Sequence, residues 1–142
     1  MLATEQVVAA VELGTADRTA DTAARVAREL GAPLVFVTVR PSRSAVLGDA
    51  ADQRRLTRDM IRGRRALDTA LAAASRHGVM SHGEIVEGDA ATQIVEYARA
   101  RGAQLLVVGA RRPRPAESVS RRVIATAHGP VLVAAPVAAA PP

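Results

Sequence analysis

The chain has no cysteine, no lysine and no tryptophan, and each of these absences excludes a kind of chemistry. Without cysteine there can be no disulfide, no thiolate zinc site and no cysteine nucleophile. All nineteen basic residues are arginines, so a P-loop lysine, a Schiff base and a lysine general base are excluded as well. The only aromatic residues are Phe36 and Tyr97. The core must therefore be built from valine, leucine, isoleucine and alanine.

The apolar residues, 49% of the total, suffice to bury a core within one domain of a 142-residue chain. We expect that domain over residues 1–134, followed by a disordered Ala/Pro tail over residues 135–142. No apolar run approaches membrane-spanning length and no signal-peptide pattern precedes the first apolar segment. We therefore expect no membrane association and a cytoplasmic location. The net charge of +5 suits nucleic acid or an acidic partner, but it also suits solubility alone.

Buried-strand patterns alternate with helical patterns along the whole chain. Strands are predicted at residues 6–12, 34–39, 80–87, 104–109 and 131–134, and helices at residues 18–30, 50–77, 90–101 and 118–128. Alternating strands and helices with continuous apolar strand runs predict an α/β fold. The expected architecture is a single-domain, five-stranded parallel sheet with helices on both faces. The third strand is the most polar and is expected near an edge.

Local signals mark where these helices begin and end. Thr15 or Asp17 can cap the first helix, and Asp89 can cap the third, which we interpret as a structural role. His77 and His128 stand near helix C-termini, where the helix dipole alone favours them. The histidines show no metal-ligand spacing, so no metal site is expected. The buried face of the first helix is predicted to contain Ala20, Ala23, Ala27 and Leu30.

The segment after the fourth strand carries the most specific signal. The strand runs into Gly109, and a loop then leads to a helix that opens at Ser118. A glycine turn that feeds a helix N-terminus is where α/β proteins bind phosphates, because free backbone N–H groups point at the anion. In this loop, however, Pro113 and Pro115 donate no N–H and push the residues before them toward extended geometry.

The chain resembles the universal stress protein family. Four segments carry the resemblance, in the family's order: VVAAVE in the first strand, VTV in the second, EGDAATQIVEYA after the third, and LLVVGAR…SVSRRVIATAHGPVLVA at the end. Together they span nearly the whole chain. The resemblance implies the sheet order 3-2-1-4-5 and a homodimer joined along the last strand, Val131–Ala134. It also implies a relation to the adenine nucleotide alpha hydrolase-like fold.

Family members that bind ATP carry the motif G-x2-G-x9-G-S/T after the fourth strand. Here Gly109 matches the first glycine and Ser118 the hydroxyl position, but Arg112 and Glu117 replace the other two glycines. The loop is also about five residues shorter than the motif requires. The resemblance implies that any nucleotide would meet Ala10, Glu12, Val39, Gly109, Arg111, Arg112, Ser118, Val119 and Ser120.

The lost glycines predict weak ATP binding. A charge-assisted hydrogen bond contributes about 1.5–3 kcal/mol, so losing two or three donors costs about two to six decades of affinity. We expect a dimeric binding or regulatory module of the stress response, not an enzyme, with no catalytic residues and with weak or lost ATP binding. One alternative is an ATP-binding, weakly hydrolysing switch in which Arg111 and Arg112 hold the phosphates.

A second alternative is a basic adaptor that docks on nucleic acid or on an acidic protein. One face of the second helix would carry it, through Arg54, Arg58, Arg62 and Arg65. Leu56, Met60, Leu67 and Leu71 fall on the opposite face. No stacking aromatic residues accompany the arginines, which counts against single-stranded nucleic acid. A solvated helix face is the simpler interpretation of this pattern.

Overall fold

In the computed structural model, residues 5–42, 50–110 and 119–135 are described. The strands are β1 (Val7–Ala10), β2 (Leu34–Arg40), β3 (Ser81–Glu87), β4 (Leu105–Gly109) and β5 (Val131–Ala134). The helices are α1 (Ala16–Leu30), α2 (Ala50–Arg76), α3 (Ala90–Ala100) and α4 (Val119–Thr126). All five strands are parallel and lie in the order β3-β2-β1-β4-β5, which confirms the predicted topology. Of the expected tail, residues 136–142 lie outside the described part of the chain.

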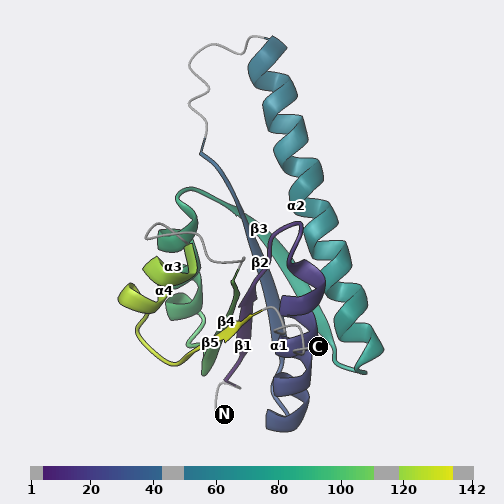
Figure 1. The fold of residues 1–142 in the computed structure, drawn as a ribbon, viewed down its shortest axis with the longest axis vertical. Helices are drawn as coiled ribbons and strands as arrows, with labels where there is room; N and C mark the ends of the chain where they lie inside the picture. Colours follow the sequence, from purple (N-terminus) through teal and green to yellow (C-terminus); the bar gives the residue numbers. More distant parts are fainter. Residues whose placement is uncertain (1–4, 43–49, 111–118, 136–142) are drawn as a thin grey trace, which may run out of the picture.

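Two helical layers enclose the sheet (Figure 1). Alternate residues of β1 separate into two clusters: Val7 and Ala9 pack with the alanines of α1 and α2, whereas Val8 and Ala10 pack with α3 and with Val123 of α4. This alternation follows from the two-residue period of a strand. A central strand that is apolar on both faces therefore needs a helix on each side, as the apolar run predicted.

Small side chains let α1 and α2 approach the sheet closely. The buried face of α1 includes Ala20, Ala23 and Ala27, as predicted, but Leu30 is 51% exposed. Leu30 is wrongly predicted because it is the last residue of α1, immediately before the C-cap Gly31, where the helix no longer covers the sheet. On α2, a Cβ at Gly63 would meet Ile85 at 3.3 Å, so the helix rests almost directly on β3.

Where the ends of the elements differ from the prediction, they differ by one or two residues. β1 stops at Ala10 instead of residue 12, because the carbonyl of Glu12 already accepts a hydrogen bond from the Thr15 amide in the turn that leads to α1. α4 ends at Thr126 instead of residue 128, and the predicted start of this helix at Ser118 lies outside the described residues. Gly31, Gly78 and Gly102 end or follow their helices with left-handed backbone, as expected for helix stops.

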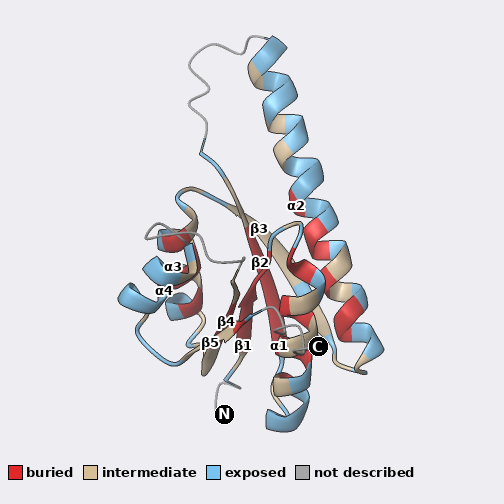
Figure 2. Ribbon diagram, viewed as in Figure 1, coloured by how far each residue is buried: buried red, intermediate tan, exposed pale blue. Residues whose placement is uncertain are grey.

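α2 extends well beyond the sheet (Figure 1). It has 27 residues, and its first buried residue is Gly63. The half that precedes Gly63 projects past the carboxyl ends of the strands and is coloured mostly as exposed in Figure 2. The helix is also not apolar enough to cross a membrane, and the same holds for every other helix in the described part of the chain.

Candidate functional site

A small cleft of about 80 Å³ opens where β1 and β4 end side by side. β1 is the point at which the strand order reverses, since its neighbours β2 and β4 follow it in opposite directions across the sheet. In open α/β sheets ligands bind at such a switch point, outside the carboxyl ends of the strands. The position of the cleft therefore makes it the candidate ligand site.

The cleft brings together six of the nine residues that the family resemblance implied. These are Ala10, Glu12, Val39, Gly109, Val119 and Ser120. Arg111, Arg112 and Ser118 lie outside the described residues. Sequence reasoning missed several further lining residues, among them Val37, Thr38, Ala90, Ile94 and Val108. Thr38 could have been found from the sequence, because it lies in the VTV segment. Ile94 could not, because no neighbouring residue shows that α3 directs its side chain toward β1.

The walls of the cleft combine apolar and polar groups. Val39, Ile94 and Val119 provide apolar surface, which suits a flat ring such as a nucleobase. Glu12 places a carboxylate at the mouth, where it can accept hydrogen bonds from hydroxyl groups. Thr38 is only 5% exposed and adds a buried hydroxyl. The arrangement can hold a small ligand with one flat apolar part and one hydroxyl-bearing part.

Gly109 has a packing role that the sequence did not show. A Cβ at this position would overlap the Thr19 hydroxyl oxygen and would lie 3.2 Å from that of Thr15. Thr15 occupies the N-cap position of α1, yet its side chain makes no capping hydrogen bond, contrary to one of our two expectations. The glycine is therefore required by the approach of α1 to β4, whether or not a phosphate binds beside it.

The end of β4 is anchored on both sides. The guanidinium of Arg18 donates a 2.7 Å hydrogen bond to the carbonyl of Ala110. The Ala110 amide donates to the carbonyl of Ala134 at the end of β5. The chain thus leaves the sheet at a defined point, next to the cleft.

Asp89 joins the two helices that form the opposite wall. As predicted, it caps α3, because its carboxylate accepts hydrogen bonds from the amide and the hydroxyl of Thr92. It also accepts two hydrogen bonds, of 3.1 and 2.8 Å, from the guanidinium of Arg122 in α4. These bonds, Arg122 first, hold the pKa of Asp89 well below its usual value. The start of α3 at Ala90 and the start of α4 at Val119 therefore both face the cleft.

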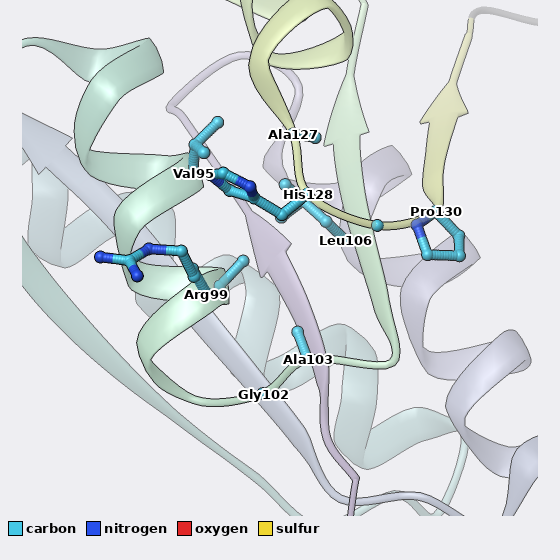
Figure 3. A pocket seen from close by; sticks show the side chains of 10 residues that line it. Val95, Arg99, Gly102, Ala103, Leu106, Ala127, His128 and Pro130 are labelled. Carbon is cyan, nitrogen blue, oxygen red and sulfur yellow. The ribbon is translucent and has the colours of Figure 1, made fainter.

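A second hollow, of about 200 Å³, lies at the other end of β4 (Figure 3). Its floor is apolar, and His128 and Arg99 stand at its rim, with the Arg99 guanidinium directed away from the hollow. Arg99 already forms a 2.8 Å ion pair with Glu96. Although this hollow is the larger, it adjoins the amino ends of β4 and β5, so the switch-point cleft is the better candidate.

The predicted arginine face of α2 is exposed along its length. Only Arg62 approaches the candidate site, since it lines a shallow hollow that also contains Glu12 and Asp59. His77, which we expected to serve the helix dipole alone, instead forms a 2.6 Å hydrogen bond with Asp21 of α1. Within the described ranges, no group of three histidine, aspartate or glutamate residues could hold a metal ion.

Comparison with known proteins agrees with the fold. A model of the universal stress protein family matches residues 4–135. A universal stress protein of Methanocaldococcus jannaschii is 41% identical over 76 residues; the match spans 50% of this chain but only 45% of the length of that relative. The comparison therefore covers about half of that protein.

Solved structures match over nearly the whole chain. A universal stress protein from Archaeoglobus fulgidus is 25% identical, with a TM-score of 0.75, and the match covers 91% of this chain and 97% of that one. A structure of the Archaeoglobus fulgidus protein in complex with dAMP is also 25% identical, with a TM-score of 0.75 over 93% and 98% of the two chains. A protein of the family from Burkholderia pseudomallei is 28% identical, with a TM-score of 0.69 over 90% and 94%.

Proposed function

The chain belongs to the universal stress protein family. We propose that it acts in the stress response as a dimeric binding module that binds nucleosides but binds phosphate groups weakly. The observation that carries this proposal is the switch-point cleft, which contains the six described residues that the family resemblance implied. A structural relative binds dAMP, which supports a nucleotide-type ligand.

The described part of the cleft suits the nucleoside end of such a ligand. Its apolar walls offer surface for a base, and the carboxylate of Glu12 suits the hydroxyls of a ribose. The apolar walls come from elements packed in the core of the fold, and Glu12 lies two residues after the end of β1. We therefore expect adenosine itself to bind.

Fewer groups are available to bind the phosphate end of such a ligand. In the sequence of residues 110–118, arginine and glutamate replace two of the three motif glycines, and the segment is about five residues shorter than the motif. Gly109 remains, but its contact with Thr19 accounts for it independently of any ligand. Arg122, a cation beside the cleft wall, is held by Asp89. Phosphate groups should consequently add little to the affinity.

Calorimetry with adenosine, AMP and Mg-ATP tests the proposal. We expect dissociation constants no tighter than about 100 µM for ATP, and within about tenfold of one another for all three ligands. Glu12→Ala should weaken all three, whereas Glu29→Ala, at an exposed position of α1 away from the cleft, should not. Low-micromolar binding of ATP, or no binding of adenosine at millimolar concentration, would contradict the proposal.

The dAMP-bound relative also favours a second candidate, an ATP-binding switch. In this case Arg111 and Arg112 would replace the missing glycine amides with side-chain donors. Arg112→Ala distinguishes the two functions. It should abolish tight ATP binding if the arginines hold the phosphates, and it should leave weak binding unchanged if they do not.

The dimer part of the proposal concerns β5. This strand is at the end of the sheet, so one side of its backbone has no partner strand among the described residues. Val131, Leu132 and Val133 are only half-buried. An apolar edge strand invites pairing with another chain, and a two-fold axis would pair β5 with its own copy.

A further inference from the structure

The projecting half of α2 lacks a packing partner within the described part of the chain. None of its residues from 50 to 62 is buried. A helix of that length is marginal in water on its own, and most helices in proteins are stabilised by packing an apolar face. Figure 2 shows this half as mostly exposed, in contrast to the packed half beside α1. The projecting half therefore presents a surface that a partner could cover.

An apolar groove runs between this part of α2 and the edge strand β3. Its apolar lining consists of Leu56, Met60, Ile61, Leu67, Gly83 and Ile85, and it encloses about 680 Å³. Met60 is 42% exposed and Ile61 is 49% exposed. Contiguous exposed apolar residues in a groove indicate an interaction surface, whereas single exposed leucines do not.

The groove is basic at its rim. Arg64 and Arg65 line it, and in the described part of the chain no hydrogen bond or ion pair occupies either guanidinium. Residues 50–65 contain six arginines and only two aspartates, which gives this part of α2 a net charge of +4. A partner that fills the groove should therefore carry acidic residues beside its apolar ones.

The shape of the groove favours a helix. α1 and α2 form one helical layer, and β3 lies at the end of the sheet under the outer side of α2. A further helix placed beside α2 would continue that layer over Gly83 and Ile85. A concave groove accepts a convex helix better than a flat bilayer, and a second copy of the chain would bring arginine against arginine.

We propose that the groove between α2 and β3 binds an acidic amphipathic helix of a partner protein. The apolar ridge of that helix would pack on Leu56 and Met60, and its flanking carboxylates would pair with Arg64 and Arg65. The interface shares Arg65 with the arginine face predicted from the sequence, but the other three arginines of that face, Arg54, Arg58 and Arg62, do not line the groove. It is also independent of the nucleotide proposal, since the cleft and the groove share no residue.

A designed peptide can serve as the probe. We would use a fluorescein-labelled peptide of about 18 residues with leucines at i, i+4, i+7 and i+11 and glutamates at most other positions. A matched peptide would carry lysine at every glutamate position. Fluorescence anisotropy at physiological salt should show binding of the acidic peptide at tens of micromolar and at least about tenfold weaker binding of the basic one.

Three variants locate the interface. Met60→Glu should reduce binding of the acidic peptide at least about tenfold. The double variant Arg64→Glu/Arg65→Glu should lose the acidic peptide and gain the basic one, as a charge swap requires. Arg58→Glu, which is exposed on the same helix but outside the groove, should change either affinity less than about twofold. Circular dichroism should show that all three variants remain folded, because the substituted side chains are exposed.

Other outcomes would overturn the proposal. Equal loss of acidic-peptide binding in Arg58→Glu would indicate general charge attraction along the arginine face. Binding that survives both Met60→Glu and the double charge reversal would place the peptide elsewhere. Assemblies larger than a dimer that Met60→Glu dissolves in light scattering would make a second copy the occupant. Co-sedimentation with vesicles of one-third phosphatidylglycerol that Met60→Glu abolishes would make a lipid surface the occupant.

Discussion

Gly109 of β4 lies so close to Thr19 of α1 that a Cβ on Gly109 would overlap the Thr19 hydroxyl oxygen. That oxygen is buried and has no hydrogen-bond partner among the described residues. Because Thr19 is buried in α1, a Cβ on Gly109 can be admitted only if the Thr19 side chain or the helix shifts. Gly109 therefore has a packing role at the position where the family motif places a phosphate-binding glycine.

We expect Gly109→Ala to lower the free energy of unfolding by about 1–3 kcal/mol, because overpacking a buried contact displaces its neighbours. Urea unfolding followed by circular dichroism measures the loss. In the double variant with Thr19→Ala, the two substitutions should cost less together than the sum of their separate costs. Strict additivity, or a Gly109→Ala variant as stable as the parent that has lost only nucleotide binding, would restore the phosphate interpretation.

The bond between His77 and Asp21 predicts a specific acid sensitivity. The hydrogen bond with His77 is the largest effect and holds the pKa of Asp21 below its ordinary value of 3.8. Burial opposes it, while the nearby charges of Arg25 and Arg76 lower the pKa further by smaller amounts. A carboxyl whose folded pKa is lowered stabilises the fold above pH 3.8 and loses that contribution as the pH falls through the folded pKa. Since the Asp21 side chain is 39% exposed, solvent screening limits the contribution to about 1 kcal/mol or less.

Asp21→Asn should therefore be less stable than the parent at pH 7, with a difference that shrinks below pH 3.8. Guanidinium unfolding at pH 7, 5 and 3 gives the three free energies that are needed. Asp68→Asn, at an exposed position of α2, is the matched control. A difference that grows as the solution is acidified would show that the Asp21 carboxylate does not stabilise the fold.

Tyr97 should titrate far above an ordinary tyrosine. Burial raises its pKa to about 12, and Glu84 acts in the same direction, while Arg101, stacked 4.7 Å from the ring centre, opposes them. Because the chain has one tyrosine and no tryptophan, absorbance near 295 nm reports this group alone. A midpoint near 10 in the folded protein would contradict the buried position, whereas a return to about 10 in urea is expected.

The proposed dimer can be tested by substitutions in β5, which lies at the opposite edge of the sheet from β3. Val131 and Val133 pack on the cluster formed with α3, and Leu132 packs on the cluster formed with α1, so β5 has apolar side chains on both faces. We expect a dimer by light scattering at tens of micromolar, and a monomer for Val133→Asp. Ile124→Asp replaces an apolar residue of α4 that is 54% exposed, and it serves as the control. A parent protein that is monomeric at this concentration would contradict the β5 interface.

Most of the fold was predictable because its signals are local. The apolar run of β2, the Asp89 cap and the left-handed glycines each specify an element from a few neighbouring residues. The prediction failed where partners are distant in sequence. Leu30 looks like a core residue on a helical wheel, but whether its side chain meets the sheet depends on where the helix ends relative to β2. The bond from His77 to Asp21 joins residues 56 positions apart, and no local pattern marks it.

The residues of the candidate site were likewise predictable only in part. Ala10, Glu12 and Val39 could be named in advance because the family resemblance implied them, and the structure places all three in the switch-point cleft. Ile94 and Ala90 could not, because their approach depends on how α3 crosses the sheet.

By itself, the sequence determined the α/β alternation, the absence of thiol and lysine chemistry and the family to which the chain belongs, since these depend on composition and on neighbouring residues. Only the tertiary structure decided that Gly109 is needed for packing, that Asp89 and Arg122 join α3 to α4, and that half of α2 stands beyond the sheet with an apolar groove beneath it. The physical reason is that packing and solvent exposure depend on the distances between elements, and those distances are set when the two helical layers close on the sheet.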